Sequence, residues 1–124
     1  MKIIVYNYKD QFALSRRQIQ TIKNVMPKEY FAPILGFHLT YDTSKPSAFE
    51  YSYETKQAFF AIPIKEKTPQ ILSKAVEELL IGLARIKAKS KFGEPLKDRE
   101  RSEYQTVVER WHGRCLEAIK ADRR

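Results

Sequence analysis

One stretch of the sequence decides the fold: residues 68–89 read TPQILSKAVEELLIGLARIKAK. Thr68 followed by Pro69 is a standard helix start, because threonine caps the first turn and proline needs no hydrogen-bond donor there. Apolar residues then recur at helical spacing along one face, and they are Leu72, Ala75, Val76, Leu79, Leu80, Leu83 and Ile86. We therefore predict a long central core helix that reaches about Lys89.

The opposite face of this helix carries Lys74, Glu77 and Arg85, and Ile81 falls among these charges. A last helix is the obvious candidate to cover Ile81. It is expected to start near Asp98 and has an apolar stripe of its own. The central helix would then lie between a sheet and the last helix.

The first half of the chain has the patterns of β-strands. Residues 3–6 are rich in β-branched side chains, residues 35–41 alternate between apolar and other residues, and residues 48–64 are typical of a β-hairpin. Between the first two strands, Ser15 and Gln18 match the capping box of a helix. The predicted fold class is α+β: a small, mostly antiparallel sheet of about four strands with three helices, in the order β-α-β-β-β-α-α.

Length and composition indicate one domain. The 124 residues suit a single domain over residues 1–120, with residues 121–124 as a disordered basic tail. Cys115 is the single cysteine and cannot form an internal disulfide, so we expect a reducing, cytoplasmic compartment. It lies on the apolar stripe of the last helix, so we expect its thiol to be buried. No apolar stretch reaches the length of a membrane span, so no membrane association is expected.

The net charge of +8 favours polyanionic partners. It is spread over both halves of the chain, with one local concentration at Arg85, Lys87, Lys89 and Lys91, which have no acidic residue among them. The same residues are also explained as a solvated helix end, because cations in a last turn interact favourably with the helix dipole. No nucleic-acid-binding motif accompanies this basic patch.

Aromatic residues are a further signal. Phe49, Tyr51 and Tyr53 alternate on one face of the expected hairpin. Rings on a sheet can stack nucleic-acid bases, and nearby lysines can meet phosphates. Three alternating aromatics are more typical of a core, so we predict that a helix packs on this face.

The sequence holds no complete catalytic or metal motif. His38 and His112 are far apart in the sequence, and one cysteine cannot supply a zinc site alone. His38 on a strand is expected to be a structural histidine, and His112 a surface or half-buried helix residue. The glycines are isolated, so no phosphate-binding loop is present. We expect no cofactor and no bound metal.

The element order and the central helix resemble the minimal zincin fold of small metallopeptidases, from the first strand to the last helix. In that family the active-site helix carries HExxH, and a following helix usually supplies the third zinc ligand. The best alignment places Glu77 at the first His, Glu78 at the general-base Glu and Ile81 at the second His. Both histidines are needed to hold the zinc that activates water. The resemblance therefore implies a degenerate, non-catalytic member.

Three functional hypotheses follow from these patterns. The first is a non-catalytic binding or interaction domain, with a protein partner near the central helix or the free sheet edge. The second is a nucleic-acid-associated basic protein that uses the Arg85–Lys91 patch. The third is a hydrolase built on Glu77, Glu78 or His112, which is the least supported because adjacent glutamates in a helix point in different directions. The sequence identifies no ligand and no oligomeric state.

Overall fold

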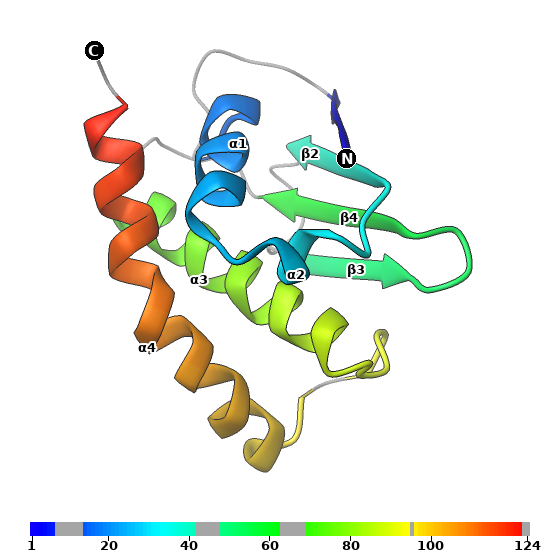
Figure 1. Cartoon of the computed structure of the whole chain (residues 1–124). Helices are drawn as coiled ribbons and strands as arrows, with labels where there is room; N and C mark the ends of the chain where they lie inside the picture. Colours follow the sequence, from blue (N-terminus) through cyan, green and yellow to red (C-terminus); the bar gives the residue numbers. More distant parts are fainter. Residues whose placement is uncertain (7–13, 42–47, 63–68, 95, 123–124) are drawn as a thin grey trace.

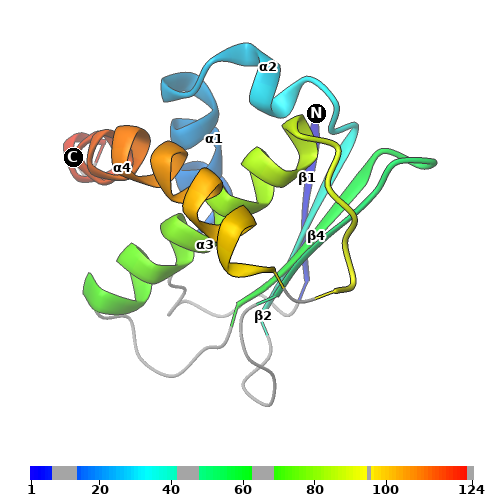
Figure 2. The same cartoon turned by 90° about the horizontal axis from the view of Figure 1, so that it is seen from below.

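The computed structural model describes residues 1–6, 14–41, 48–62, 69–94 and 96–122. Its strands are β1 (Lys2–Tyr6), β2 (Gly36–Tyr41), β3 (Ala48–Ser52) and β4 (Gln57–Ile62). Its helices are α1 (Arg16–Val25), α2 (Lys28–Phe31), α3 (Pro69–Lys87) and α4 (Asp98–Ala121). These helices all lie on one face of the sheet (Figure 1, Figure 2). The predicted α+β class is confirmed.

The sheet is mixed, with the strand order β1-β2-β4-β3. The pairs β1–β2 and β2–β4 are parallel, and only the pair β3–β4 is antiparallel. The prediction of a mostly antiparallel sheet is therefore wrong. A helix between β1 and β2 allows these strands to run parallel. β4 lies between β2 and β3, and its core side is fully buried through Ala58, Phe60 and Ile62, whereas on the same side of β3 Phe49 is only half-buried.

The start of α1 follows the predicted capping box. The backbone N–H of Gln18 donates to Ser15 Oγ at 3.2 Å, and the backbone N–H of Ser15 donates to Gln18 Oε1 at 2.8 Å. α1 ends at Val25, and Pro27 lies directly before the first residue of α2. α2 has four residues, too few to show a helical period in the sequence, so a further helix appears where three were predicted.

The central helix α3 is buried from two sides. One side packs on β3, and the other contacts α4, which also lies against α1 (Figure 1, Figure 2). Leu79, Leu80 and Leu83 are fully buried, and Ile81 is only 7% exposed. The predicted covering of Ile81 is thus confirmed. None of the described helices is long and apolar enough to cross a membrane.

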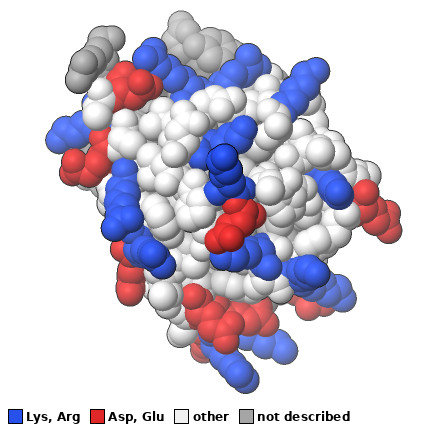
Figure 3. Space-filling view, in the orientation of Figure 1, with Lys and Arg blue, Asp and Glu red and all other residues white. Residues whose placement is uncertain are grey.

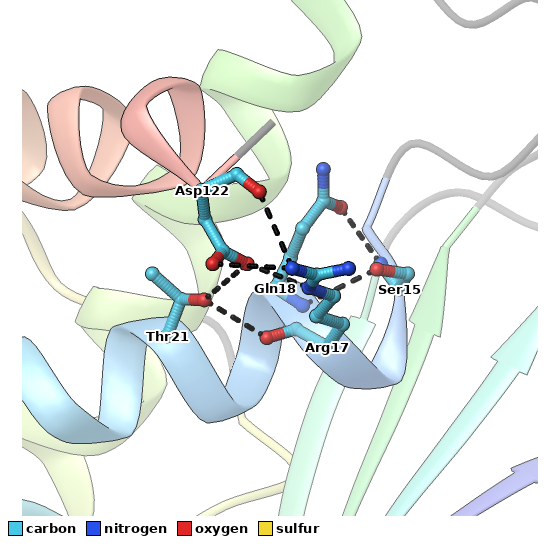
Figure 4. A network of polar contacts seen from close by, with 5 residues as sticks. All are labelled: Ser15, Arg17, Gln18, Thr21 and Asp122. Atoms are coloured by element: carbon cyan, nitrogen blue, oxygen red, sulfur yellow. Dashed lines mark hydrogen bonds and ion pairs between the residues drawn. The ribbon is translucent and has the colours of Figure 1, made fainter. Parts of the chain in front are cut away.

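The end of α4 is tied to α1 (Figure 4). Arg17 donates to Asp122, with 2.8 Å between Nε and Oδ2 and 3.3 Å between Nη2 and Oδ1. This bond holds the pKa of the Asp122 carboxyl below its ordinary value. α4 extends to Ala121, so the predicted disordered tail does not include Ala121 or Asp122, and the rest of it lies outside the described residues.

The capping box gives a first prediction. Ser15→Ala removes the acceptor for the Gln18 N–H and is expected to lower the free energy of unfolding by about 1 kcal/mol. Urea denaturation measures this loss. Gln20→Ala, at an exposed position of the same helix, is the control and should change stability by less than about 0.5 kcal/mol. Equal stability of the two variants would show that the cap is not needed.

Candidate binding groove

β3 and α3 come into direct contact at Gly82. A Cβ atom at this position would lie 2.5 Å from two atoms of the Phe49 ring, so only glycine lets the ring lie against the helix backbone. Phe49 also meets the rings of Phe37, Phe60 and Phe92, with centroids 5.7 to 6.2 Å apart. Gly82 therefore sets the distance between the edge of the sheet and α3.

The predicted burial of the hairpin aromatics is confirmed for Tyr51, confirmed in part for Phe49 and wrong for Tyr53. Tyr51 is buried and its hydroxyl donates to the carbonyl O of Pro33 at 2.6 Å. Phe49 is half-buried under α3. Tyr53 belongs to the turn after β3 and remains 43% exposed. This face of the sheet is core, as the sequence indicates.

A groove of about 410 Å³ opens beside the Phe49–Gly82 contact. It is lined by β3, α3, the segment that follows α3 and the first turn of α4: Ala48, Phe49, Glu50, Glu78, Ile81, Gly82, Arg85, Phe92, Gly93, Glu94, Leu96 and Arg101. Sequence analysis did not single out Gly82, Phe92 or Leu96. The available signal was a glycine inside the apolar stretch of a helix, which often has a packing reason.

One wall of the groove is an edge strand. β3 stands at the end of the sheet and, within the described ranges, forms a strand pair only with β4. The outer side of an edge strand presents N–H and C=O groups that can pair with another extended segment. A groove beside such an edge also offers space for side chains of that segment.

Arg85 turns toward the groove and is held there. Its guanidinium carbon lies 4.4 Å from the centre of the Phe92 ring, and Nη2 donates to the carbonyl O of Lys91 at 2.6 Å. Its Nε is buried and has no hydrogen-bond partner among the described residues. Buried donors are normally paired, so this guanidinium retains an unused capacity to donate.

Glu78 brings a carboxyl group to the same groove. Burial raises the pKa of this carboxyl, and the neighbouring Glu77 charge raises it further, whereas Lys74 and Arg101 lower it. The side chain is only half-buried. Its protonated form is thus favoured more in the folded chain than in the unfolded one.

The three residues that align with the HExxH motif do not all face the same site. Glu78 and Ile81 line the groove, whereas Glu77 does not. His112, on α4, lies with Nε2 2.8 Å from the carbonyl O of Ser73, so this nitrogen carries a proton and donates. No group of three or more His, Cys, Asp and Glu side chains among the described residues is arranged to hold a metal ion.

The basic patch does not form one free surface. Lys87 pairs with Glu29 at 2.8 Å, and Lys91 with Glu94 at 3.3 Å. Among the described residues, Arg85 and Lys89 form no ion pair, and Arg85 lines the groove. Figure 3 shows cationic side chains spread over the helical face and interleaved with acidic ones.

The surroundings of Cys115 and His38 are those of residues that stabilise the fold. Cys115 is fully buried, and burial raises the pKa of its thiol to about 11, so the reactive thiolate is disfavoured. His38 has both ring nitrogens partnered: Nδ1 lies 2.9 Å from the hydroxyl of Tyr6 and Nε2 lies 2.7 Å from Gln57 Oε1. A buried thiol and a satisfied histidine agree with the sequence predictions.

Comparison with protein families, curated proteins and solved structures gave no match for this chain. The chemistry of the groove residues therefore has to carry the functional proposal.

Two glycines in helices give a second prediction. Gly82→Ala forces the Phe49 ring away from α3, and overpacking of this kind costs about 1 to 3 kcal/mol of unfolding free energy. Gly113 in α4 has nothing within 4 Å of a built Cβ, so Gly113→Ala should stabilise by about 0.5 to 1 kcal/mol through helix propensity. Denaturant unfolding compares them. A stabilising Gly82→Ala would contradict the close contact with Phe49.

The surroundings of Glu78 give a third prediction. Because folding raises its pKa, the charged carboxylate costs stability above the folded pKa, and this cost disappears as the pH falls below the unfolded value. Glu78→Gln should therefore unfold at a higher temperature than the parent near pH 7, with an advantage that shrinks toward pH 4. Thermal melts across this pH range measure it. Glu109→Gln, on the exposed side of α4, is the control, and an equal pH profile for both variants would refute the assignment.

Proposed function

We propose that the chain is a non-catalytic binding domain with a zincin-like scaffold, and that its groove holds an extended peptide segment of a protein partner. The observation that carries the proposal is the position of the groove between an edge strand and α3. The peptide pairs its backbone with β3 and places side chains in the groove.

The strand β3 supports this mode of binding. It has five residues and one antiparallel neighbour, β4. A peptide that adds to the outer edge of such a strand gains main-chain hydrogen bonds, and alternate side chains then reach toward the adjoining pocket. The Phe49–Gly82 contact holds the edge against α3, so the binding surface is formed before the peptide arrives.

The lining of the groove indicates which side chains it accepts. Ile81, Phe92 and Leu96 offer apolar contacts, while Glu78 and Arg101 bring opposite charges. The exposed lining of the groove is more polar than apolar, so its polar groups fix the orientation of a ligand. The fitting peptide carries polar or charged side chains beside a smaller apolar one.

The helix that the zincin resemblance aligns with HExxH also supports binding without turnover. Ile81 has no metal-ligating atom, and His112 uses Nε2 on Ser73. Without zinc, Glu78 has no metal-bound water to deprotonate. Stoichiometric zinc in protein purified without a tag would overturn the non-catalytic assignment.

Selection from a random displayed library of 12-residue peptides, followed by NMR mapping of a selected peptide, tests the proposal. We expect backbone amide shifts concentrated in β3, residues 78–85 of α3 and residues 92–101. Arg101→Glu should weaken binding, whereas Arg99→Glu, in the same turn but outside the groove, should not. Shifts confined to other surfaces, or equal effects of the two variants, would refute the groove as the site.

A further inference from the structure

One face of the sheet is covered by no described helix (Figure 2). A row of aromatic rings crosses this face. Tyr6 of β1, His38 of β2 and Phe59 of β4 stand on neighbouring strands. The rings of Tyr6 and His38 are stacked with centroids 5.8 Å apart, and those of His38 and Phe59 with centroids 4.5 Å apart. The interplanar angles are 16° and 14°. We call these three residues the aromatic ladder.

The ladder is held in place by hydrogen bonds. His38 meets the Tyr6 hydroxyl through Nδ1 and the Gln57 side chain through Nε2. The middle ring is thus fixed from both sides, and it gives the Phe59 ring a fixed surface to stack on.

The two end rings are open to solvent, at 44% exposed for Tyr6 and 46% for Phe59. One face of Phe59 meets His38, and no ring from the described residues meets the other face, which looks toward Glu50 of β3. A further planar ring stacked there would extend the ladder by one step.

The surroundings favour a planar ligand over an apolar protein surface. On β3 this face carries Ala48, Glu50 and Ser52, and on β4 Gln57 and Ala61 flank Phe59, because alternate residues of a strand share a face. Ile4 is the one large aliphatic side chain at the described positions of this face. Protein interfaces usually have a more apolar centre than this.

Basic residues stand at one end of the sheet. The backbone N–H of Lys2 donates to the carbonyl O of Leu35 at 2.9 Å. The backbone N–H of Leu35 in turn donates to the carbonyl O of Lys56 at 2.8 Å. Lys2 and Lys56 therefore lie near each other across the ends of three strands, and neither forms an ion pair within the described part of the chain. The hydroxyl of Tyr53, in the same turn as Lys56, donates to the carbonyl O of Ser90 at 2.5 Å, which places the segment after α3 beside this turn.

We infer that this open face binds single-stranded nucleic acid, with a base stacked on Phe59 and backbone phosphates at Lys2 and Lys56. Phe59 and Lys56 are three residues apart, about 10 Å along extended chain. Stacking on an aromatic ring requires a base whose face is free, which a single strand offers and a duplex does not. The net charge of +8 complements a polyanion, and the Glu50 carboxylate is an acceptor for base amino groups. This site differs from the Arg85–Lys91 patch, and it shares with the groove only Ala48 and Glu50 of the edge strand β3.

Fluorescence anisotropy with labelled 12-nucleotide mixed-sequence DNA and RNA, single-stranded and duplex, tests the inference. Single strands should bind more tightly than duplexes at equal salt. Phe59→Ala should weaken single-strand binding by about 5- to 100-fold, as the loss of one stacked base predicts, and Phe59→Trp should retain it. Gln20→Ala removes an exposed side chain of α1, away from the open face, and should bind as the parent does.

The contribution of the lysine charges is measured separately, through the salt dependence of the affinity. Lys2→Gln and Lys56→Asn should each reduce the slope of log affinity against log salt by about 0.7. Asparagine is chosen because Lys56 has a φ of 57°, which asparagine tolerates. Lys120→Gln on α4 is the control, with an unchanged slope.

Three outcomes would overturn the inference: no single-strand binding at low salt, duplex binding as tight as single-strand binding, or parental affinity in folded Phe59→Ala. Sedimentation of the same proteins separates a further case. If the parent is a dimer that Phe59→Ala converts to a monomer, and neither binds oligonucleotides, the open face joins two copies of the chain and the inference is wrong.

Discussion

Burial of α3 from two sides is the constraint on which the structure depends. A helix with apolar residues nearly all round its central turns must be covered on more than one face. The sheet covers one side and α4 the other. Because α1 and α3 both support α4, the helices gather on one face of the sheet. The other face is left to the strands alone, and the molecule therefore has two different sides.

Local patterns were sufficient to predict the elements but not their neighbours. The capping box at Ser15 and the stripe of α3 rest on residues three or four apart, so the sequence shows them directly. The insertion of β4 between β2 and β3 depends on pairing between distant segments, which alternation within one strand does not report. The apolar run of β4 was the available signal, because the most buried strand of a sheet takes a central place.

The groove and the aromatic ladder were less predictable than the helices and strands, because they too depend on contacts between distant segments. Gly82 and Phe49 are 33 positions apart, and only the fold shows that they touch. The Arg85–Lys91 patch looked free in the sequence because its partners, Glu29 and Phe92 among them, cannot be assigned from charge alone. The aromatic ladder combines one ring from each of three strands, so it depends on register as well as composition. β4 links both surfaces, since Phe60 packs against Phe49 near the groove while its neighbour Phe59 faces the opposite way.

The bond between Arg17 and Asp122 joins residues 105 positions apart, and α4 packs on helices made much earlier in synthesis. While the ribosome is still adding residues 98–122, the outer side of α3 has no cover, and the growing chain exposes an apolar helix surface. Such a surface is prone to association with other chains. Docking of α4 is thus the step that covers this surface, and the chain is prone to such association until α4 has docked.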